Sequence, residues 1–159
     1  MRPKPHSLLA GFTVVELLVV MIVIGVLSTV IFTNISDARK RSRDTERASD
    51  IDLISSRLEE YYNDKGGYPN TFTAATLGNL DPAILKDPNN VSITIASAAS
   101  DQYAARAVSN PTSSANYKYI PYPSGCNTIT CTGYVLKAYI EQPSGKLPDP
   151  YTKYGLNNN

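Results

Sequence analysis

Side chains able to carry out acid–base or nucleophilic chemistry are scarce in this sequence. The 159 residues include one histidine, His6, and two cysteines, Cys126 and Cys131. The sequence has no glycine-rich phosphate loop with its lysine, no Cys-x-x-Cys pair and no nucleophile elbow. Carboxylates are plentiful, but the sequence alone does not place two of them across a cleft. We therefore expect no catalytic residue, no metal site and no cofactor, and the protein is not expected to be an enzyme.

The two cysteines are separated by the four residues from Asn127 to Thr130. This is not the two-residue spacing of redox or zinc motifs, and two thiolates are too few for a tetrahedral metal site. The spacing favours a disulfide between Cys126 and Cys131 that closes a hairpin loop, which requires an oxidising compartment. Two free, buried thiols are the alternative.

A long apolar stretch begins next to the carboxylate of Glu16. From Leu17 to Ser36 no residue is charged, and this length matches the roughly 20 residues that a helix needs to cross the hydrocarbon core of a bilayer. The stretch is apolar on every face of a helix, which favours lipid or sister helices around it. We therefore expect residues 12–36 to form a membrane-spanning helix.

Glu16 requires a partner in such surroundings. A charge in the middle of a membrane helix costs about 2.5 to 3.5 kcal/mol, and no Lys or Arg lies close to Glu16 in the sequence. A cut after Gly11 would create a new amino terminus on Phe12 that supplies the cation. Alternatively, Glu16 lies near the lipid headgroups and its side chain extends to them.

The segment from Gly11 to Val20 reads Gly-Phe-Thr-Val-Val-Glu-Leu-Leu-Val-Val, after a short basic leader. It resembles the processing and methylation motif of type IV pilins and of the pseudopilins of type II secretion and competence systems. The resemblance implies that a prepilin peptidase removes residues 1–11 by cutting between Gly11 and Phe12. It also implies N-methylation of Phe12 and a role for Glu16 in filament assembly. In one departure, Thr33 stands where many members carry a proline.

The resemblance also implies partners and a location. The partners are further copies of the chain, a prepilin peptidase, a pilus assembly platform and membrane lipid before assembly. The chain would be a single-pass cytoplasmic membrane protein first and part of an extracellular pilus afterwards. The positive-inside rule alone would place the downstream domain in the cytoplasm, because the basic residues after the apolar run outnumber those of the leader.

Removal of the leader would remove Arg2, Lys4 and His6. Of the 15 Lys and Arg residues 13 would remain, against 14 Asp and Glu. This balance gives no indication of a nucleic-acid surface over the whole protein.

The helix is expected to continue past the apolar run into a head domain, residues 37–159. No Gly or Pro appears between Phe32 and Gly66, and the glycines and proline of segment 63–69 predict the end of the helix. Positions with a three-four spacing predict a core-facing stripe: Thr45, Ala48, Ile51, Ile54, Leu58, Tyr61 and Tyr62. The mixed charges from Asp37 to Asp52 are interpreted either as a solvated face or as contacts with neighbouring subunits.

The rest of the head is expected to form a small antiparallel sheet. Strands are predicted over 91–95, 117–120 and 133–141, with a short helical piece after Asp81. Segment 96–116 is expected to be a surface excursion with room for a short helix, and residues 147–159 an irregular tail. The tyrosines of the head are expected either to pack half-buried against the helix or to be exposed for adhesion or subunit contact.

The predicted fold class is therefore α+β. A long N-terminal helix, membrane-spanning in its first half and amphipathic in its second, would pack on a small antiparallel β-sheet, as in pilins. The resemblance implies a structural subunit of a type IV pilus that polymerises through this helix into a filament for adhesion, motility or DNA uptake. A pseudopilin of a type II secretion or competence system is the first alternative. The second is a single-pass membrane-anchored enzyme or sensor, which the loss of the only histidine disfavours.

Overall fold

The computed structural model describes residues 11–112, 117–127 and 129–156, without the side chains of residues 30–34. The predicted leader residues before Gly11, His6 among them, lie outside the described part. The chain divides into two units, one ending at Arg39 and the other beginning at Lys40.

Helix α1, Val14–Lys65, belongs to both units. Its first turn is capped by Thr13, whose Oγ1 accepts a hydrogen bond from the backbone N–H of Glu16 at 3.2 Å. The helix ends because Gly66 adopts the left-handed conformation, with φ at 79°, and donates its N–H to the carbonyl of Tyr62 at 2.7 Å. Glycine adopts this conformation without steric cost. The predicted helix end within segment 63–69 is confirmed.

In the first unit, the described side chains of α1 are uncovered. From Phe12 to Leu27 the large apolar side chains have exposed fractions between 50% and 85%. Within the part of the chain that the structure describes, no helical stretch combines the length and the apolar character of a membrane span.

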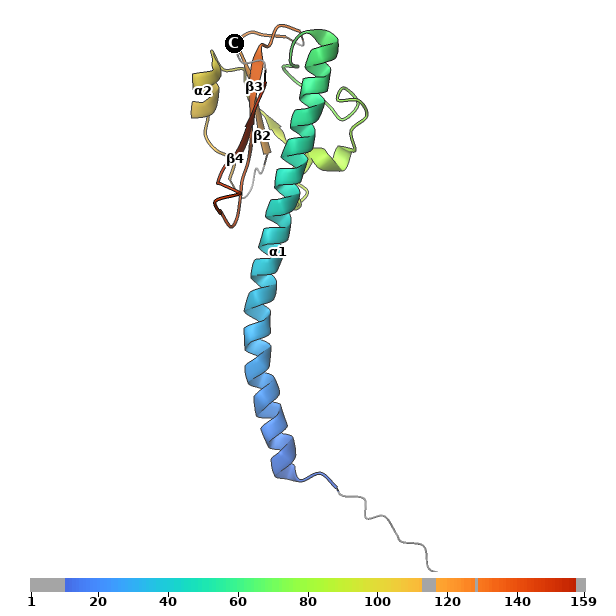
Figure 1. The fold of residues 1–159 in the computed structure, drawn as a ribbon, viewed down its shortest axis with the longest axis vertical. Coiled ribbons are helices and arrows are strands. Elements are labelled where there is room, and N and C mark those ends of the chain that lie inside the picture. The colour runs from blue at the N-terminus through green and yellow to red at the C-terminus, as the bar shows by residue number, and fades with distance from the viewer. Residues whose placement is uncertain (1–10, 113–116, 128, 157–159) are drawn as a thin grey trace, which may run out of the picture. The chain divides into compact units, whose positions relative to one another are not determined.

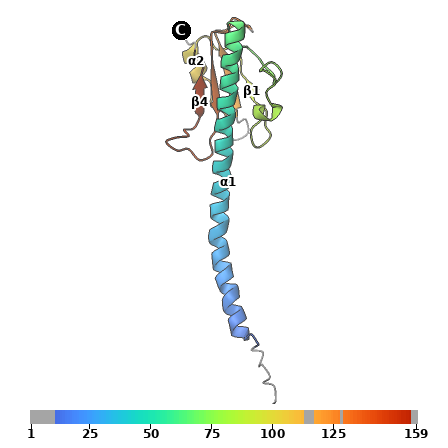
Figure 2. The same ribbon diagram turned by 45° about the vertical axis from the view of Figure 1, so that its right-hand side comes forward.

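The second unit is a head of the α+β class, as predicted (Figures 1 and 2). A four-stranded sheet lies between the second part of α1 and the short helix α2, in the strand order β1-β2-β3-β4. A 3-10 helix, η1, follows α1 and is capped by the side chain of Asp81, as the sequence predicted. The bounds are η1 Pro82–Leu85, β1 Thr94–Ile95, α2 Gln102–Ala107, β2 Tyr117–Tyr122, β3 Gly133–Ala138 and β4 Tyr151–Tyr154.

The sheet is mixed, so the prediction of an antiparallel sheet is wrong for its first pair. Strands β2 and β3, and strands β3 and β4, are antiparallel, but β1 runs parallel to β2 with Thr94 opposite Lys118. Between these two strands the chain passes through α2 on the opposite face of the sheet from α1. Such a crossover returns the chain in its original direction, which makes the pairing parallel.

Two strand predictions need correction. The predicted strand 91–95 is reduced to Thr94–Ile95, because the Asp87 side chain accepts the N–H of Val91 at 2.8 Å and holds the preceding residues in a turn. Conversely, the expected irregular tail contains β4. This edge strand begins directly after Pro150, a position where a proline is tolerated because it removes no ladder hydrogen bond.

The two faces of the sheet bury two separate clusters. The larger lies against α1 and confirms most of the predicted helix stripe, with Ile51, Ile54 and Leu58 fully buried. Thr45 is exposed, so it does not belong to that stripe. The smaller cluster lies under α2 and consists of Ala105, Ile120, Tyr122 and Val135.

Candidate functional site

The residues predicted to be processed lie at the start of the described chain. Gly11 and Phe12 are exposed and precede α1, and Glu16 lies in its first turn. A carboxylate is favoured there by the partial positive charge of a helix N-terminus. Sequence reasoning missed the capping role of Thr13, although Thr13-x-x-Glu16 is the pattern of a helix capping box.

The apolar side chains from Phe12 to Leu27 form a continuous uncovered surface. Even the least exposed of them, Val20 and Val23, are half accessible. Soluble monomers rarely expose contiguous apolar surface of this extent, and such surface marks a site of contact with protein or membrane. In the first unit, this surface is the feature that requires a partner outside the single chain.

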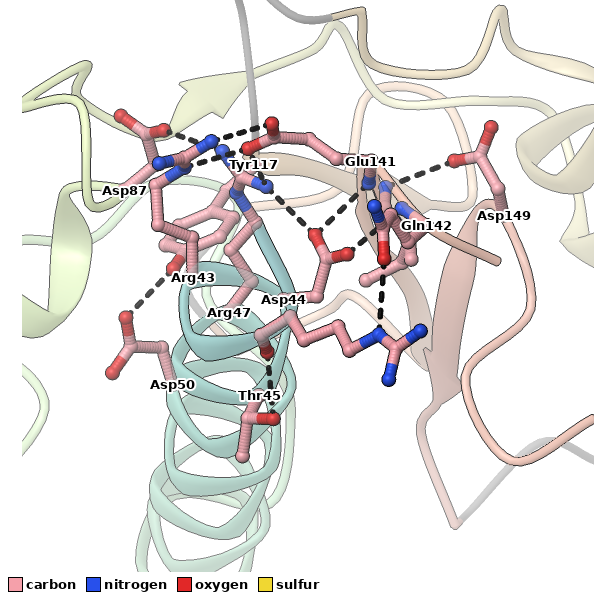
Figure 3. Close-up of polar contacts among 12 residues, drawn as sticks. Arg43, Asp44, Thr45, Arg47, Asp50, Asp87, Tyr117, Glu141, Gln142 and Asp149 are labelled. Atoms are coloured by element: carbon pink, nitrogen blue, oxygen red, sulfur yellow. Dashed lines mark hydrogen bonds and ion pairs between the residues drawn. The ribbon is translucent and has the colours of Figure 1, made fainter. Parts of the chain in front are cut away.

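In the head, α1 is joined to two loops by a buried ion cluster (Figure 3). We call it the arginine cluster; its members are Arg43, Asp44, Arg47, Asp87 and Glu141. Arg47 lies at its centre and is fully buried. Its Nη1 donates to Oδ1 of Asp44 and to Oε1 of Glu141, both at 2.9 Å, and its Nη2 lies 3.5 Å from Oδ2 of Asp87.

Asp44 completes the connection to the segment after β3. Its two carboxylate oxygens accept the backbone N–H groups of Glu141, at 2.9 Å, and Gln142, at 2.8 Å. Arg43 holds the same segment from the helix surface, with Nε 2.8 Å and Nη2 2.6 Å from the two oxygens of Glu141. Two planar groups that match in this way make a strong, directional pair.

Hydrogen bonds within the arginine cluster shift the pKa of two of its members, Glu141 and Arg43. Hydrogen bonds from Arg43, and then from Arg47, lower the pKa of Glu141 to about 2 although burial opposes the shift. The same hydrogen bond to Glu141 raises the pKa of Arg43. Glu141 and Arg43 are therefore both charged at neutral pH, which keeps this ion pair intact.

The arginine cluster corrects one interpretation of the charged segment Asp37 to Asp52. Asp44 and Arg47 are neither solvated nor available to a neighbouring subunit, because both are buried inside the head. Each carries a formal charge in a segment of mixed polarity, so no local pattern indicates that their side chains point inward. A charge with this burial must be paired, which is what the structure provides.

Further along α1, carboxylates accept hydrogen bonds from tyrosines of the sheet. Asp50 accepts the hydroxyl of Tyr117 at 2.6 Å, and Glu59 accepts those of Tyr68 at 2.7 Å and Tyr134 at 3.1 Å. Burial is the main cause that raises the pKa of Tyr117 and of Tyr134, so both hydroxyls stay protonated.

These contacts decide between the two roles expected for the tyrosines. Tyr117, Tyr119 and Tyr134 are fully buried against α1, and Tyr122 is buried under α2. Tyr103, on α2, is 85% exposed. Packing is therefore the role of most of the tyrosines in the strands, and Tyr103 is available for contact.

On the opposite face of the sheet, Lys137 binds the C-terminal end of α2. This buried lysine donates to the carbonyls of Arg106 and Val108, both at 2.8 Å, and to Oδ1 of Asn110 at 3.0 Å. Burial, and then the neighbouring Lys118, lower its pKa. A lysine that ends a helix in this way was not visible in the sequence, because its acceptors lie in a distant segment.

The expected disulfide between Cys126 and Cys131 is present. The loop that it closes lies against the end of α1, where the N–H of Tyr68 donates to the carbonyl of Cys131 at 2.9 Å. A Cβ on Gly67 would overlap the backbone oxygen of Ile129, so only glycine fits there. The disulfide loop therefore fixes the position of the segment that follows α1.

Comparison with known proteins identifies relatives in two kinds of machinery. The type IV wide pilus major component PilA4 of Thermus thermophilus is 34% identical over 93 residues, which cover 58% of this chain and 68% of that protein. The type II secretion system core protein G of Pectobacterium carotovorum is 29% identical over 80 residues. The core protein G of Escherichia coli is 33% identical over 61 residues, or 38% of this chain and 42% of that protein.

The chain spans about half the length of the Pectobacterium protein, with 51% of it covered. No family model matches the chain, and no solved structure matches it. The PilA4 match extends over two thirds of that relative at more than 30% identity. With this likeness, and with the long helix and its packed head, the chain belongs to the family of type IV pilins and type II secretion pseudopilins.

Proposed function

We propose that the chain is a structural subunit of a type IV pilus that polymerises through α1 into an extracellular filament. The observation that carries the proposal is the uncovered apolar surface from Phe12 to Leu27. Exchange of this surface from lipid to sister helices keeps it out of water at every stage. Close packing between the helices then supplies the attraction, because lipid chains are as apolar as the side chains that they cover. The work of the protein is associative rather than catalytic.

Processing would prepare the chain for this step. A prepilin peptidase cuts between Gly11 and Phe12 and the new amine of Phe12 is N-methylated, while the helix stays in the cytoplasmic membrane. The new cation and the carboxylate of Glu16 then form a pair between neighbouring subunits on an assembly platform. Gly11 and Phe12 are exposed and lie outside α1, a position that suits access by a peptidase.

The disulfide supports an exported head, because such bonds persist in oxidising compartments and the Cys126–Cys131 bond fixes a loop of the head. The second candidate function is that of a pseudopilin, which would form a short filament inside a type II secretion machine. It is favoured by the core proteins G among the relatives.

The test uses the full chain, produced in a bacterium that keeps its prepilin peptidase and assembly platform but lacks its own major pilin. We expect mass spectrometry to find a mature chain that starts at N-methyl-Phe12, and immunogold electron microscopy to find labelled surface filaments. The matched control Gly11→Leu should remain uncleaved and form none. A mature chain that still begins at Met1, or that begins after Phe32, would overturn the proposal; labelled filaments only on overproduction would favour the pseudopilin.

A further inference from the structure

The face of α1 that points away from the sheet carries a regular row of residues. We call it the outer stripe; it comprises Ser42, Glu46, Ser49, Leu53, Ser56 and Glu60, all exposed. Residues seven apart on a helix lie on one line along its surface, so the serines form one row and Glu46, Leu53 and Glu60 another. The outer stripe is therefore an uncovered helix face inside the otherwise packed head.

Leu53 is the large apolar side chain of this stripe and is 39% exposed. Glu46 and Glu60 lie one seven-residue step on either side of it, which is about 10 Å along the helix axis. Glu60 pairs with Arg57 at 2.6 Å beside the stripe. The stripe itself thus offers an apolar side chain between two carboxylates, with serines that allow another surface to approach closely.

A groove that includes an arginine, and so could pair with the carboxylates of the outer stripe, lies on another side of the head. It has a volume of about 360 Å³ and lies between α1 and segment 142–147. Its wall includes Arg41 and Thr45 from α1 and Pro143, Ser144 and Leu147 from the segment. We call it the 142–147 groove.

The charge that the groove presents is positive. Asp44 also lines it, but both of its carboxylate oxygens are already bonded, to Arg47 and to the N–H groups of Glu141 and Gln142. Arg41 is exposed, and its Nε donates to Oε1 of Gln142 at 3.1 Å. Because this bond uses only Nε, the other donors of the Arg41 guanidinium remain on the rim of the groove, next to apolar Pro143 and Leu147.

We propose that the 142–147 groove binds the outer stripe of a second copy of this chain. Leu53 of one head packs against Pro143 and Leu147 of the next, and a stripe carboxylate pairs with Arg41. The two surfaces differ, so the contact is heterologous, and a heterologous contact that does not close into a ring produces an open helical polymer. The proposal rests on the proposed function, to which it adds a specific contact between heads.

The first test is cysteine cross-linking in assembled filaments. One copy carries Leu53→Cys, another carries Ser144→Cys, and both are produced together with the wild-type chain so that filaments still form. We expect a cross-linked dimer on non-reducing gels when both variants are present, and none when either is present alone, because a heterologous contact does not bring a residue to its own copy. The matched control replaces Leu53→Cys by Ile129→Cys, an exposed position in the disulfide loop, and should give no dimer.

The second test exchanges the charges. Arg41→Glu should lower the number of filaments at equal membrane levels of protein by about tenfold, as expected when a central interface charge is reversed. Combination with Glu46→Arg or with Glu60→Arg should restore filaments, and the restoring partner identifies which carboxylate binds Arg41. Glu46→Arg and Glu60→Arg alone serve as controls for an effect of the reversed stripe charge.

The outcomes separate this contact from the proposed function. If the wild-type chain forms no filaments, the proposed function fails, and the contact fails with it. If filaments form but neither the Leu53–Ser144 dimer nor the restoration by charge exchange appears, filament assembly stands and the head contact is overturned.

Discussion

Nη1 of Arg47 lies 2.9 Å from Oε1 of Glu141, although the two residues are 94 positions apart in the chain. One residue belongs to α1 and the other to the segment that follows β3. The same guanidinium also lies against Asp87, in the turn before β1. A single buried side chain thus connects three segments of the head that lie far apart in the sequence.

Arg47→Leu should be strongly destabilising, because it leaves the carboxylates of Asp44, Asp87 and Glu141 without their shared cation. Removal of one partner from a buried ion pair typically costs about 3 to 5 kcal/mol. Urea unfolding of the mature chain in detergent, followed by the near-ultraviolet circular dichroism of its tyrosines, measures this. The control Arg57→Leu breaks an exposed pair with Glu60 and should cost no more than about 1 kcal/mol. Equal losses for the two variants would contradict the central role of Arg47.

Stability should fall in acid through Glu141. Its pKa in the folded head is lowered from 4.5 to about 2, so its contribution is complete above pH 4.5 and is lost as the pH falls through about 2. The full loss is on the order of 3 kcal/mol. The free energy of unfolding of wild type and of Glu141→Gln, measured between pH 6 and pH 2, should converge toward the acid end. Parallel curves would show that Glu141 is not held ionised by its arginines.

The disulfide should protect both cysteines from alkylation and stabilise the head. Intact-mass analysis of the exported protein, alkylated without reductant, should find no label on Cys126 or Cys131. Reduction should cost about 2 kcal/mol, since the closed loop is short. Full labelling of both thiols in the native protein would refute the bond.

Gly67→Ala should destabilise the contact between the disulfide loop and the end of α1. The new Cβ would overlap the backbone oxygen of Ile129, and a shift of two backbone segments costs roughly 1 to 3 kcal/mol. Gly145→Ala is the matched control, because nothing lies within 4 Å of its Cβ, and its effect should stay within about 0.5 kcal/mol. Thermal unfolding of the two variants side by side measures the difference, and similar midpoints would count against the close approach.

Glu16→Val should insert into the membrane and be cleaved, yet assemble poorly. The Phe12 amine of each subunit would then lie in the low-dielectric filament core without a counter-charge. Glu16→Asp should be intermediate, since it keeps the charge and shortens the reach. Thr13→Val is the control: it removes the helix cap and keeps the carboxylate, so filaments should still form. A count of filaments at equal membrane levels decides the matter. If Glu16→Val formed filaments in normal number, the carboxylate would not be required for assembly, and its role would be confined to the first turn of α1.

Features that depend on neighbouring residues were predictable from the sequence. Gly66 ended α1 where the glycine pattern placed the end, Asp81 capped a short helix before a proline, and the two cysteines joined within one loop. In each case the interacting groups lie within a few residues of one another, so a local pattern contains the whole interaction.

Features that depend on distant partners were not predictable. Asp44 and Arg47 have the spacing of an exposed helix pair, and only the packing of Asp87 and Glu141 against them makes the site a buried one. Strand β4 follows two prolines that favour a loop, and its strand character depends on pairing with β3. The parallel direction of β1 likewise depends on the path of the chain through α2 rather than on the residues of the strand.

The links between α1 and the rest of the head are distributed along the helix, at Asp44, Asp50, Asp52 and Glu59. A pull along the helix axis loads all of these links at once, as in a shear joint, so several must break together before the helix slides. A pull across the axis loads them one after another and peels them. The head is therefore strongest against tension in the direction of its own helix, and the arginine cluster shares that load with the tyrosine contacts further along α1.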